Sequence, residues 1–427
     1  MNGTDTAALD ASLLAREAWI ARAGRRWGAL AHAGALAFVA MLYSSPQFWW
    51  PAFERFRLAY ASAAILAGAV VVHRVVSGER IRVGGWGTVL VFAYLSFIPL
   101  SLAWTIDRNE TLRQSVEAWK MAVIFVAVQN AVDTRERLRR FLLVAALASL
   151  GPALGGIEVW RTGDALVDGF RTHWRGNYAD PNRLAMSVIA VLPFALYGAW
   201  TARQRWARVA FLAVVVAQIA CVVLTHSRSG TIGAGLAVMV FLARGRRGVP
   251  RALVAGVVLA GALAAWAPET FWQRNATLGN LEEDESVQGR EHAWEVLGVI
   301  VQERPLTGVG AGAFLSAWYR YAPLSAGGHR YVAHNILLEI VGDLGVLAFA
   351  LFAAFAAWAL RLIWRAGDDP LVGIEARAVF GALVGYLVCE MANGYSMSWY
   401  LYFLFACGLA AVRMARLRRA LAEEAVA

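Results

Sequence analysis

The chain of 427 residues is 59% hydrophobic, holds 18 tryptophans and carries a formal net charge of +10, and its mean hydropathy is +0.51. This composition is far more apolar than that of soluble domains, so we expect an integral membrane protein. The recurring apolar runs are long enough to cross a bilayer as helices, which excludes the short strands of a β-barrel. The positive charge lies in arginine clusters between these runs, which favours contact with lipid headgroups over nucleic acid.

The apolar runs predict an all-α polytopic fold with about twelve membrane-spanning helices. Their centres lie near residues 36, 67, 95, 122, 149, 192, 215, 236, 259, 348, 383 and 405. The connections alternate between arginine-rich and arginine-poor, and the positive-inside rule places the arginine-rich ones in the cytoplasm. Both termini are therefore expected in the cytoplasm. The first apolar run is expected to be kept as an anchor, because it leads straight into further spans.

Two of the outward connections are longer than the others. Residues 160–182 form a medium loop, and residues 268–333 form a long loop that is too polar to span a membrane. In the long loop, Trp294, Leu297 and Val301, with Ile300 beside them, follow helical spacing. We therefore expect a small helical cap on the membrane surface. A single membrane domain of residues 1–427 with this cap accounts for the whole chain.

Three glycines and three cysteines are interpreted as structural residues. The glycines at positions 308, 310 and 312 break the helical pattern of the long loop and predict a flexible turn; no strand precedes them, as a dinucleotide site would require. The cysteines at positions 221, 389 and 407 lie in or beside apolar runs. They show no CxxC spacing and no histidine placed to complete a metal site, so we expect small core residues and no metal.

Outward loops should be poor in arginine, yet four stretches carry arginine or histidine there. They are "FRTHWRGNYADPNRLAM" with Arg171, Arg175 and Arg183; "THSRSGTIG" with Arg228; "GREHAW" with Arg290; and "GGHRYVAHN" with His329, Arg330 and His334. The guanidinium group matches phosphate oxygens and keeps its charge, so several of them meeting at one membrane face would form a pyrophosphate clamp. For a single arginine, headgroup contact or an ion pair with Asp168, Asp180 or Glu291 is the alternative.

His334 begins a predicted helix at the outward surface, beside Asn335. The unperturbed pKa of histidine lies near neutrality, so the ring can accept a proton from a sugar hydroxyl; a hydrogen-bonded interface anchor is the alternative. Glu339 lies about 140° from His334 on a helical wheel and is not predicted to orient the ring. Glu339 and Asp343 share another face and are expected to bind neighbouring helices.

The only lysine of the chain, Lys120, lies within the fourth apolar run, three residues after Glu117. An ion pair between the two would neutralise both charges inside the membrane. A proton relay is the alternative.

Five blocks follow one another along the chain: "GNYADPNRLAM", "LTHSRSGTIG", "GREHAWEV", "RPLTGVGAGAF" and "AHNILLEIVGDLGVLAFA". Together they resemble the O-antigen ligase and O-antigen polymerase superfamily over roughly residues 170 to 350. The resemblance implies a metal-independent, inverting glycosyltransferase of the GT-C type, without a cofactor, at the periplasmic face of a Gram-negative inner membrane. Its donor would be a glycan on undecaprenyl pyrophosphate, and a ligase would use a sugar hydroxyl of the lipid A-core as acceptor.

The resemblance also implies roles for individual residues. His334 matches the histidine of the last block and would be the base, and Arg183, Arg228 and Arg290 match the arginines of the earlier blocks and would bind pyrophosphate. Further candidate substrate contacts are Asn182, Arg175, His329, Arg330 and Asn335. His226 and His292 flank two of the arginines, so chemistry alone does not single out the base.

Within the superfamily the ligase is favoured, because one late loop dominates and no large C-terminal extension follows. An O-antigen polymerase or a protein O-oligosaccharyltransferase of the same superfamily is the alternative, and a lipid-linked glycan flippase or transporter is a more distant one. Transporters place their functional charges near the middle of the membrane, whereas the unusual charges here gather at one face. The expected partners are the two lipid-linked substrates and membrane lipids; we expect a monomer, with an oligomer left open.

Overall fold

The computed structural model describes residues 3–83, 85–244, 248–276, 285–322 and 330–425. Across these ranges the chain is almost entirely helical and contains no strand, apart from one isolated bridge between Val167 and Arg171. The prediction of an all-α polytopic fold is thereby confirmed.

The α-helices are α1 (Gly3–Ser44), α2 (Leu58–Val76), α3 (Gly85–Leu100), α4 (Arg108–Ala131), α5 (Arg135–Ala148), α6 (Leu150–Thr162), α7 (Pro181–Ile189), α8 (Leu192–Thr201), α9 (Arg205–Leu224), α10 (Arg228–Leu242), α11 (Gly248–Trp266), α12 (Glu269–Ala276), α13 (Glu285–Glu303), α14 (Phe314–Tyr321), α15 (Ile336–Ala366), α16 (Gly373–Glu390) and α17 (Trp399–Glu424). Short 3₁₀ helices are η1 (Pro46–Phe48), η2 (Pro51–Phe56), η3 (Ser101–Ala103) and η4 (Gly176–Tyr178).

Nine helical segments of the described residues are long and apolar enough to cross a membrane, and α10 is a shorter apolar helix. The chain is therefore a multi-pass membrane protein. All the predicted span centres lie in helices except the one at Ser149, which joins α5 and α6 within one candidate span, Arg135–Thr162. Helices α4 and α16 hold predicted centres but are not among the nine, so the number twelve stays a prediction.

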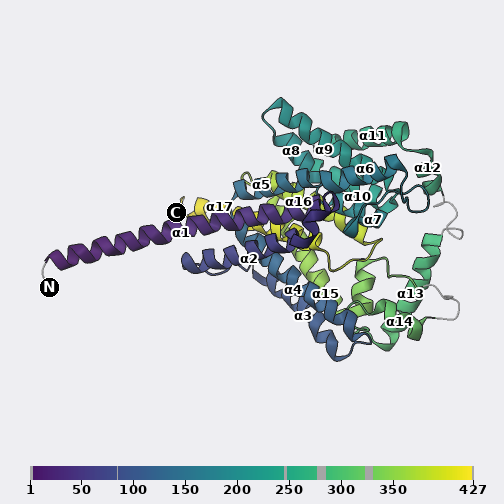
Figure 1. Cartoon of the computed structure of the whole chain (residues 1–427), viewed down its shortest axis with the longest axis horizontal. Helices are drawn as coiled ribbons and strands as arrows, with labels where there is room; N and C mark the ends of the chain where they lie inside the picture. Colours follow the sequence, from purple (N-terminus) through teal and green to yellow (C-terminus); the bar gives the residue numbers. More distant parts are fainter. Residues whose placement is uncertain (1–2, 84, 245–247, 277–284, 323–329, 426–427) are drawn as a thin grey trace.

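Most helices pack into one bundle, with the two chain termini at one end and α12, α13 and α14 at the other (Figure 1). The centre of the bundle is formed by α17 and by the segment Pro181–Thr201, because 83% of the apolar window of each is buried. Only 11% of the window of α11 is buried. Helix α11 therefore presents most of its apolar surface outward, as expected for contact with lipid.

Helices α13 and α14 form a small hydrophobic cluster of their own. Leu297 and Ile300 of α13 pack there with Phe314 and Trp318 of α14. The face predicted for α13 is only partly correct, because Trp294 is 46% exposed and its indole N–H donates to the Ala333 carbonyl at 3.3 Å. The position of α14, and not the largest side chain, decides which face of α13 is buried.

The three glycines of the long loop lie in a segment that enters a break in α15. The helix is interrupted at Gly345, where φ is 81°, and the amide of Val346 donates to the carbonyl of Pro305 at 2.8 Å. Gly308 also has a positive φ of 59°, and a Cβ on it would collide with the backbone of Gly342 and Asp343. The predicted turn is confirmed. We expected it to be flexible, but it is closely packed against the backbone of α15.

Candidate active site

Three helices begin close together at the end of the bundle that carries α12–α14, and each N-terminus is capped by a polar side chain. The caps are Asp180 for α7, Ser227 for α10 and Asn335 for α15. Such N-termini carry partial positive charge and attract anions. The sequence adds a basic residue to each, since Arg183 lies in the first turn of α7, Arg228 is the first residue of α10 and His334 precedes the cap of α15.

Arg171 joins the N-termini of α7 and α10. Its side chain is buried, and its Nε donates to the carbonyl of Thr225 at 3.1 Å, just before α10. Its Nη2 donates to Oδ1 of Asn182 in α7 at 3.0 Å, and Asp168 lies 3.5 Å from Nη1. Burial lowers the pKa of Arg171, and the two carboxylates of Asp168 and Asp180 oppose that effect. Arg171 therefore has a structural role: it joins α7 to the start of α10 and faces Asp168, as the ion-pair alternative predicted.

The loop between α16 and α17 joins α7 to α15. The Cζ of Arg183 lies 4.7 Å from the centroid of the Tyr395 ring, in cation–π geometry. The neighbouring Gly394 has a positive φ of 68°, and a Cβ there would lie 3.0 Å from the amide nitrogen of Asn335 and 3.4 Å from that of His334. Only glycine allows this approach, so the loop lies between Arg183 and His334.

Two carboxylates hold this loop, the half-buried Glu339 and the buried Glu390. Oε1 of Glu339 accepts hydrogen bonds from the hydroxyl of Ser396 at 2.8 Å and from its amide at 3.3 Å. Oε2 of Glu390 accepts one from the amide of Tyr395 at 2.8 Å. The expectation that Glu339 binds a neighbouring helix was wrong, because its partner is the loop that carries Tyr395. The Arg183 guanidinium is close enough to Glu339 and Glu390 to interact electrostatically with both.

His334 is half-buried and has a left-handed backbone with φ 50°, which is uncommon for a residue other than glycine. Burial lowers the pKa of His334, the positive charge of Arg290 lowers it further, and the carboxylate of Asp180 raises it. A histidine with a lowered pKa is mostly neutral at neutral pH and can accept a proton. The same electrostatic coupling shows that Arg290 of α13 lies near His334.

The third arginine predicted to bind pyrophosphate, Arg228, is half-buried, and its Nη2 donates to the carbonyl of Arg274 in α12 at 2.6 Å. Nη1 of Arg274 lies 3.6 Å from Asp168, the carboxylate that also faces Arg171. Arg171, Arg228 and Arg274 therefore form a second group of guanidinium groups beside the first. Arg274 lay outside the sequence prediction.

The remaining predicted contacts have varied surroundings. Asn182 accepts its hydrogen bond from Arg171, and Oδ1 of Asn335 caps α15 by accepting from the amides of Leu337 and Leu338 at 3.0 and 3.3 Å. Arg175 donates to the carbonyl of Phe48 at 2.9 Å. Arg330 lies over the ring of Tyr319, 5.0 Å from its centroid. His329 falls outside the described residues.

The competing histidine His226 is occupied by structural contacts. It is buried, Nδ1 lies 2.9 Å from the carbonyl oxygen of Leu224, and Nε2 lies 2.9 Å from the hydroxyl of Thr270. With both ring nitrogens engaged, His226 is poorly placed to take a proton from a substrate. His292 is half-buried on α13, where its ring lies 6.3 Å from that of Tyr331. These contacts argue against His226 as the base.

Two further acidic residues, Asp343 and Glu117, form structural contacts. Asp343 accepts hydrogen bonds from the amides of Gly312 at 2.7 Å and Phe314 at 3.1 Å, so it binds the start of α14 and not the side of a helix. Lys120 Nζ lies 2.6 Å from Oε1 of Glu117, which confirms the predicted ion pair.

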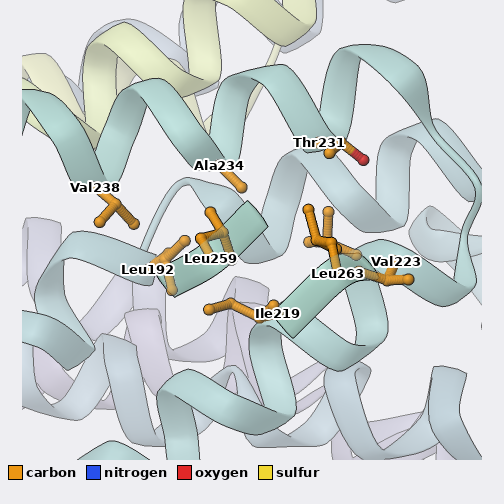
Figure 2. Close-up of a pocket in the computed structure, with 9 residues that line it drawn as sticks. Leu192, Ile219, Val223, Thr231, Ala234, Val238, Leu259 and Leu263 are labelled. Carbon is orange, nitrogen blue, oxygen red and sulfur yellow. The ribbon is translucent and has the colours of Figure 1, made fainter. Parts of the chain in front are cut away.

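The bundle also contains an apolar pocket that is separate from this site. Figure 2 shows an apolar pocket between α8, α9, α10 and α11, with Leu259 and Leu263 facing Ile219 and with Thr231 as its one polar side chain. No titratable group lines it, so transfer chemistry has no basis there. Among the described residues, no group of three or more histidine, cysteine, aspartate or glutamate side chains could hold a metal ion.

Sequence reasoning missed Tyr395 and assigned Asp180 only as an ion-pair partner. An aspartate before "PN" does carry an N-cap signal, because proline is favoured at the first helical position. Tyr395 gave no usable signal, since a tyrosine between two apolar runs is typical of a membrane interface.

Comparisons with known proteins bear on this arrangement. Residues 213–353 match the family model described as O-antigen ligase, which supports the O-antigen ligase and polymerase superfamily indicated by the sequence blocks. The matched segment includes Arg228, Arg290 and His334. No match was found among curated proteins. Among solved structures, a chain from work described as "Structural coordination of polymerization and crosslinking by a peptidoglycan synthase complex" is 16% identical, with a TM-score of 0.44, over 78% of this chain and 97% of that chain.

Proposed function

We propose that this protein is an O-antigen ligase, which transfers a glycan from undecaprenyl pyrophosphate to a sugar hydroxyl of the lipid A-core during lipopolysaccharide biosynthesis. The family match indicates glycosyl transfer in general. The observation that carries the finer proposal is that Arg290 acts electrostatically on His334, while the loop with Gly394 and Tyr395 joins His334 to Arg183. We place this site at the periplasmic face of a Gram-negative inner membrane, with both termini in the cytoplasm.

In the proposed reaction the acceptor hydroxyl attacks the anomeric carbon of the donor glycan. A bond forms between the acceptor oxygen and that carbon, the bond from that carbon to the phosphate oxygen breaks, and undecaprenyl pyrophosphate leaves with the electron pair. His334 takes the hydroxyl proton, and attack from the face opposite the leaving group inverts the anomeric configuration. This follows the GT-C-type chemistry that the sequence resemblance implies.

The leaving group is already stable as an anion, so it needs positive charge more than it needs a proton. Arg183, Arg228 and Arg290 would supply that charge. The backbone that carries Arg183 and Arg228 is fixed before substrate binds, since Asp180 and Ser227 cap α7 and α10 and Arg171 joins the two N-termini. We therefore propose a metal-independent clamp without a cofactor.

An apolar groove beside the site supports a lipid-linked donor. It lies between α2 and α4, has a volume of about 360 Å³, and is lined by residues that include Tyr60, Trp119, Lys120 and Trp399. Glu117, the ion-pair partner of Lys120, is close enough to Tyr395 to interact electrostatically. The Lys120 wall of the groove is therefore near the Arg183–Tyr395 pair, and we propose that the groove holds part of one lipid chain.

The test uses purified protein with undecaprenyl-pyrophosphate-linked O-antigen and lipid A-core in detergent with a chelator. A ligase forms core-linked glycan under these conditions. In cells, a ligase deletion leaves bare core while lipid-linked polymer accumulates, whereas a polymerase deletion leaves core bearing one repeat. Transfer to a protein in place of lipid A-core would indicate an oligosaccharyltransferase, and either of the last two results would contradict the proposal.

A further inference from the structure

A second pocket lies at the end of the bundle opposite the candidate active site. It has a volume of about 440 Å³ and is formed by α5, α8 and α9, with Arg139, Leu143, Gly198, Arg203, Gln204 and Phe211 among its lining residues. Helix α9 begins at this pocket and ends next to Thr225, which belongs to the active-site end. Its 20 residues separate the two places by roughly 30 Å. The pocket is therefore distinct from the site of transfer.

The charges of this pocket are unlike those around it. On α5, Arg135, Arg137 and Arg140 form ion pairs with Glu375, Asp133 and Glu136 respectively. Arg139, on the same two turns, forms neither an ion pair nor a hydrogen bond within the described part of the chain, and the same holds for Arg203 across the pocket. Two cationic side chains thus line one pocket, and no carboxylate is among its lining residues.

The backbone adds a third attraction for an anion. Gln204 is the N-cap of α9, and its side chain makes no capping hydrogen bond. The first amide groups of a helix of this length bind phosphate readily when no side chain satisfies them. The pocket floor is apolar, with Leu143 and Phe211, and Trp206 beside it is 71% exposed, as tryptophan often is at a membrane interface.

We propose that this pocket binds an anionic phospholipid from the surrounding leaflet. Arg139, Arg203 and the N-terminus of α9 bind its phosphodiester, and part of an acyl chain lies along Leu143 and Phe211. Basic pockets between membrane helices at an arginine-rich face bind such headgroups. A zwitterionic lipid brings its own cation to the same place, so it should bind more weakly. The proposal does not depend on the proposed transferase activity.

The test measures lipid binding by the purified full chain with native mass spectrometry. Phosphatidylglycerol and phosphatidylethanolamine are titrated separately onto delipidated protein. We expect one preferred phosphatidylglycerol site, and we expect Arg139→Gln combined with Arg203→Gln to weaken it by at least about ten-fold, because each arginine contributes to anion attraction. Arg140→Gln is the matched control, since Arg140 lies on the next position of α5 and is paired with Glu136; it should leave binding unchanged.

A second variant separates the pocket from general surface charge. Ala207 also lines the pocket. Ala207→Trp keeps every arginine but places a large side chain in the pocket, so it should also abolish the preferred site; this outcome decides the question if the double variant fails to fold. Excess inorganic phosphate should not displace the lipid, because the acyl contacts are absent from phosphate. Equal binding of the two lipids, unchanged binding in the variants, or complete displacement by phosphate would each overturn the proposal.

Discussion

Arg183 and Tyr395 come from distant parts of the sequence, and the Arg183 guanidinium lies over the Tyr395 ring at 4.7 Å from its centroid. Arg183 belongs to the first sequence block, and Tyr395 to the short loop before α17. The pair therefore connects α7 to a loop that also contacts the backbone of His334 through Gly394. This loop therefore links the positions of the proposed clamp and the proposed base.

Tyr395→Leu should reduce kcat/KM for transfer by about ten-fold, because losing a partly desolvated cation–π contact of about 1 to 2 kcal/mol leaves Arg183 less well positioned. Tyr395→Phe keeps the aromatic face and should stay within about two-fold of wild type, since the hydroxyl plays no part in a cation–π contact. Steady-state kinetics with lipid-linked donor measures both. Equal activities of the two variants would show that the ring does not position Arg183.

The acid side of the pH–rate profile should report the protonation of His334. The pKa of His334 is lowered by burial and by Arg290, so wild-type activity should be retained below the usual histidine pKa and fall only at lower pH. Arg290→Gln removes a cation, which should raise the pKa of His334 and move this limb to higher pH. Asp180→Asn removes an anion and should move it to lower pH.

The measurement is kcat/KM against pH for each variant, with Arg161→Gln as the control. Arg161 is an exposed arginine paired with Glu158 at the end of α6, so its loss should leave the profile in place. Shifts of the Arg290 and Asp180 variants in the same direction would contradict the electrostatic account, because the two charges have opposite signs.

Asp343→Ala should destabilise the protein by about 1 to 3 kcal/mol, because it leaves the amides of Gly312 and Phe314 without their acceptor. Asp164→Ala, at an exposed loop position, should change stability by less than about 0.5 kcal/mol. Thermal unfolding in detergent compares the two. A midpoint for Asp343→Ala equal to that of the control would mean that the carboxylate does not hold the start of α14.

Gly345→Ala should be more destabilising than a typical glycine substitution. The residue has φ 81°, and a Cβ there would collide with the backbone of Leu306 and Thr307, so we expect a loss of more than about 1 kcal/mol. Gly235→Ala in α10 is the control, since nothing lies within 4 Å of its Cβ position. That variant should be neutral or slightly stabilising, because alanine favours helix. Similar unfolding midpoints would contradict the tight packing at the break in α15.

The sequence predicted those features that depend on local pattern. Long apolar runs located the helices, and three-residue spacing predicted the Glu117–Lys120 pair. Local sequence patterns did not predict contacts between distant segments. The insertion of residues 305–312 into the break in α15 depends on close backbone contacts at Gly308 and Gly345, where a Cβ would collide. The burial of Leu297 with Phe314 depends on where α14 docks.

In the candidate site, too, sequence patterns identified individual residues but not the contacts between distant segments. Family blocks nominated Arg183, Arg228, Arg290 and His334, but no local pattern reveals that Arg171 ties two helix N-termini through Thr225 and Asn182. The electrostatic effect of Asp180 on His334 likewise arises only because the fold brings the starts of α7 and α15 near each other.

The most direct test of the central claim is the initial rate of glycan transfer by purified His334→Gln protein, measured with lipid-linked donor and lipid A-core and compared with His226→Gln. Glutamine keeps a polar side chain but cannot accept the proton, so His334→Gln should lose about 10²- to 10⁴-fold in kcat while donor binding stays within a few-fold of wild type. His226→Gln should retain far more activity, provided that it folds. A His334→Gln rate within a few-fold of wild type would contradict the account.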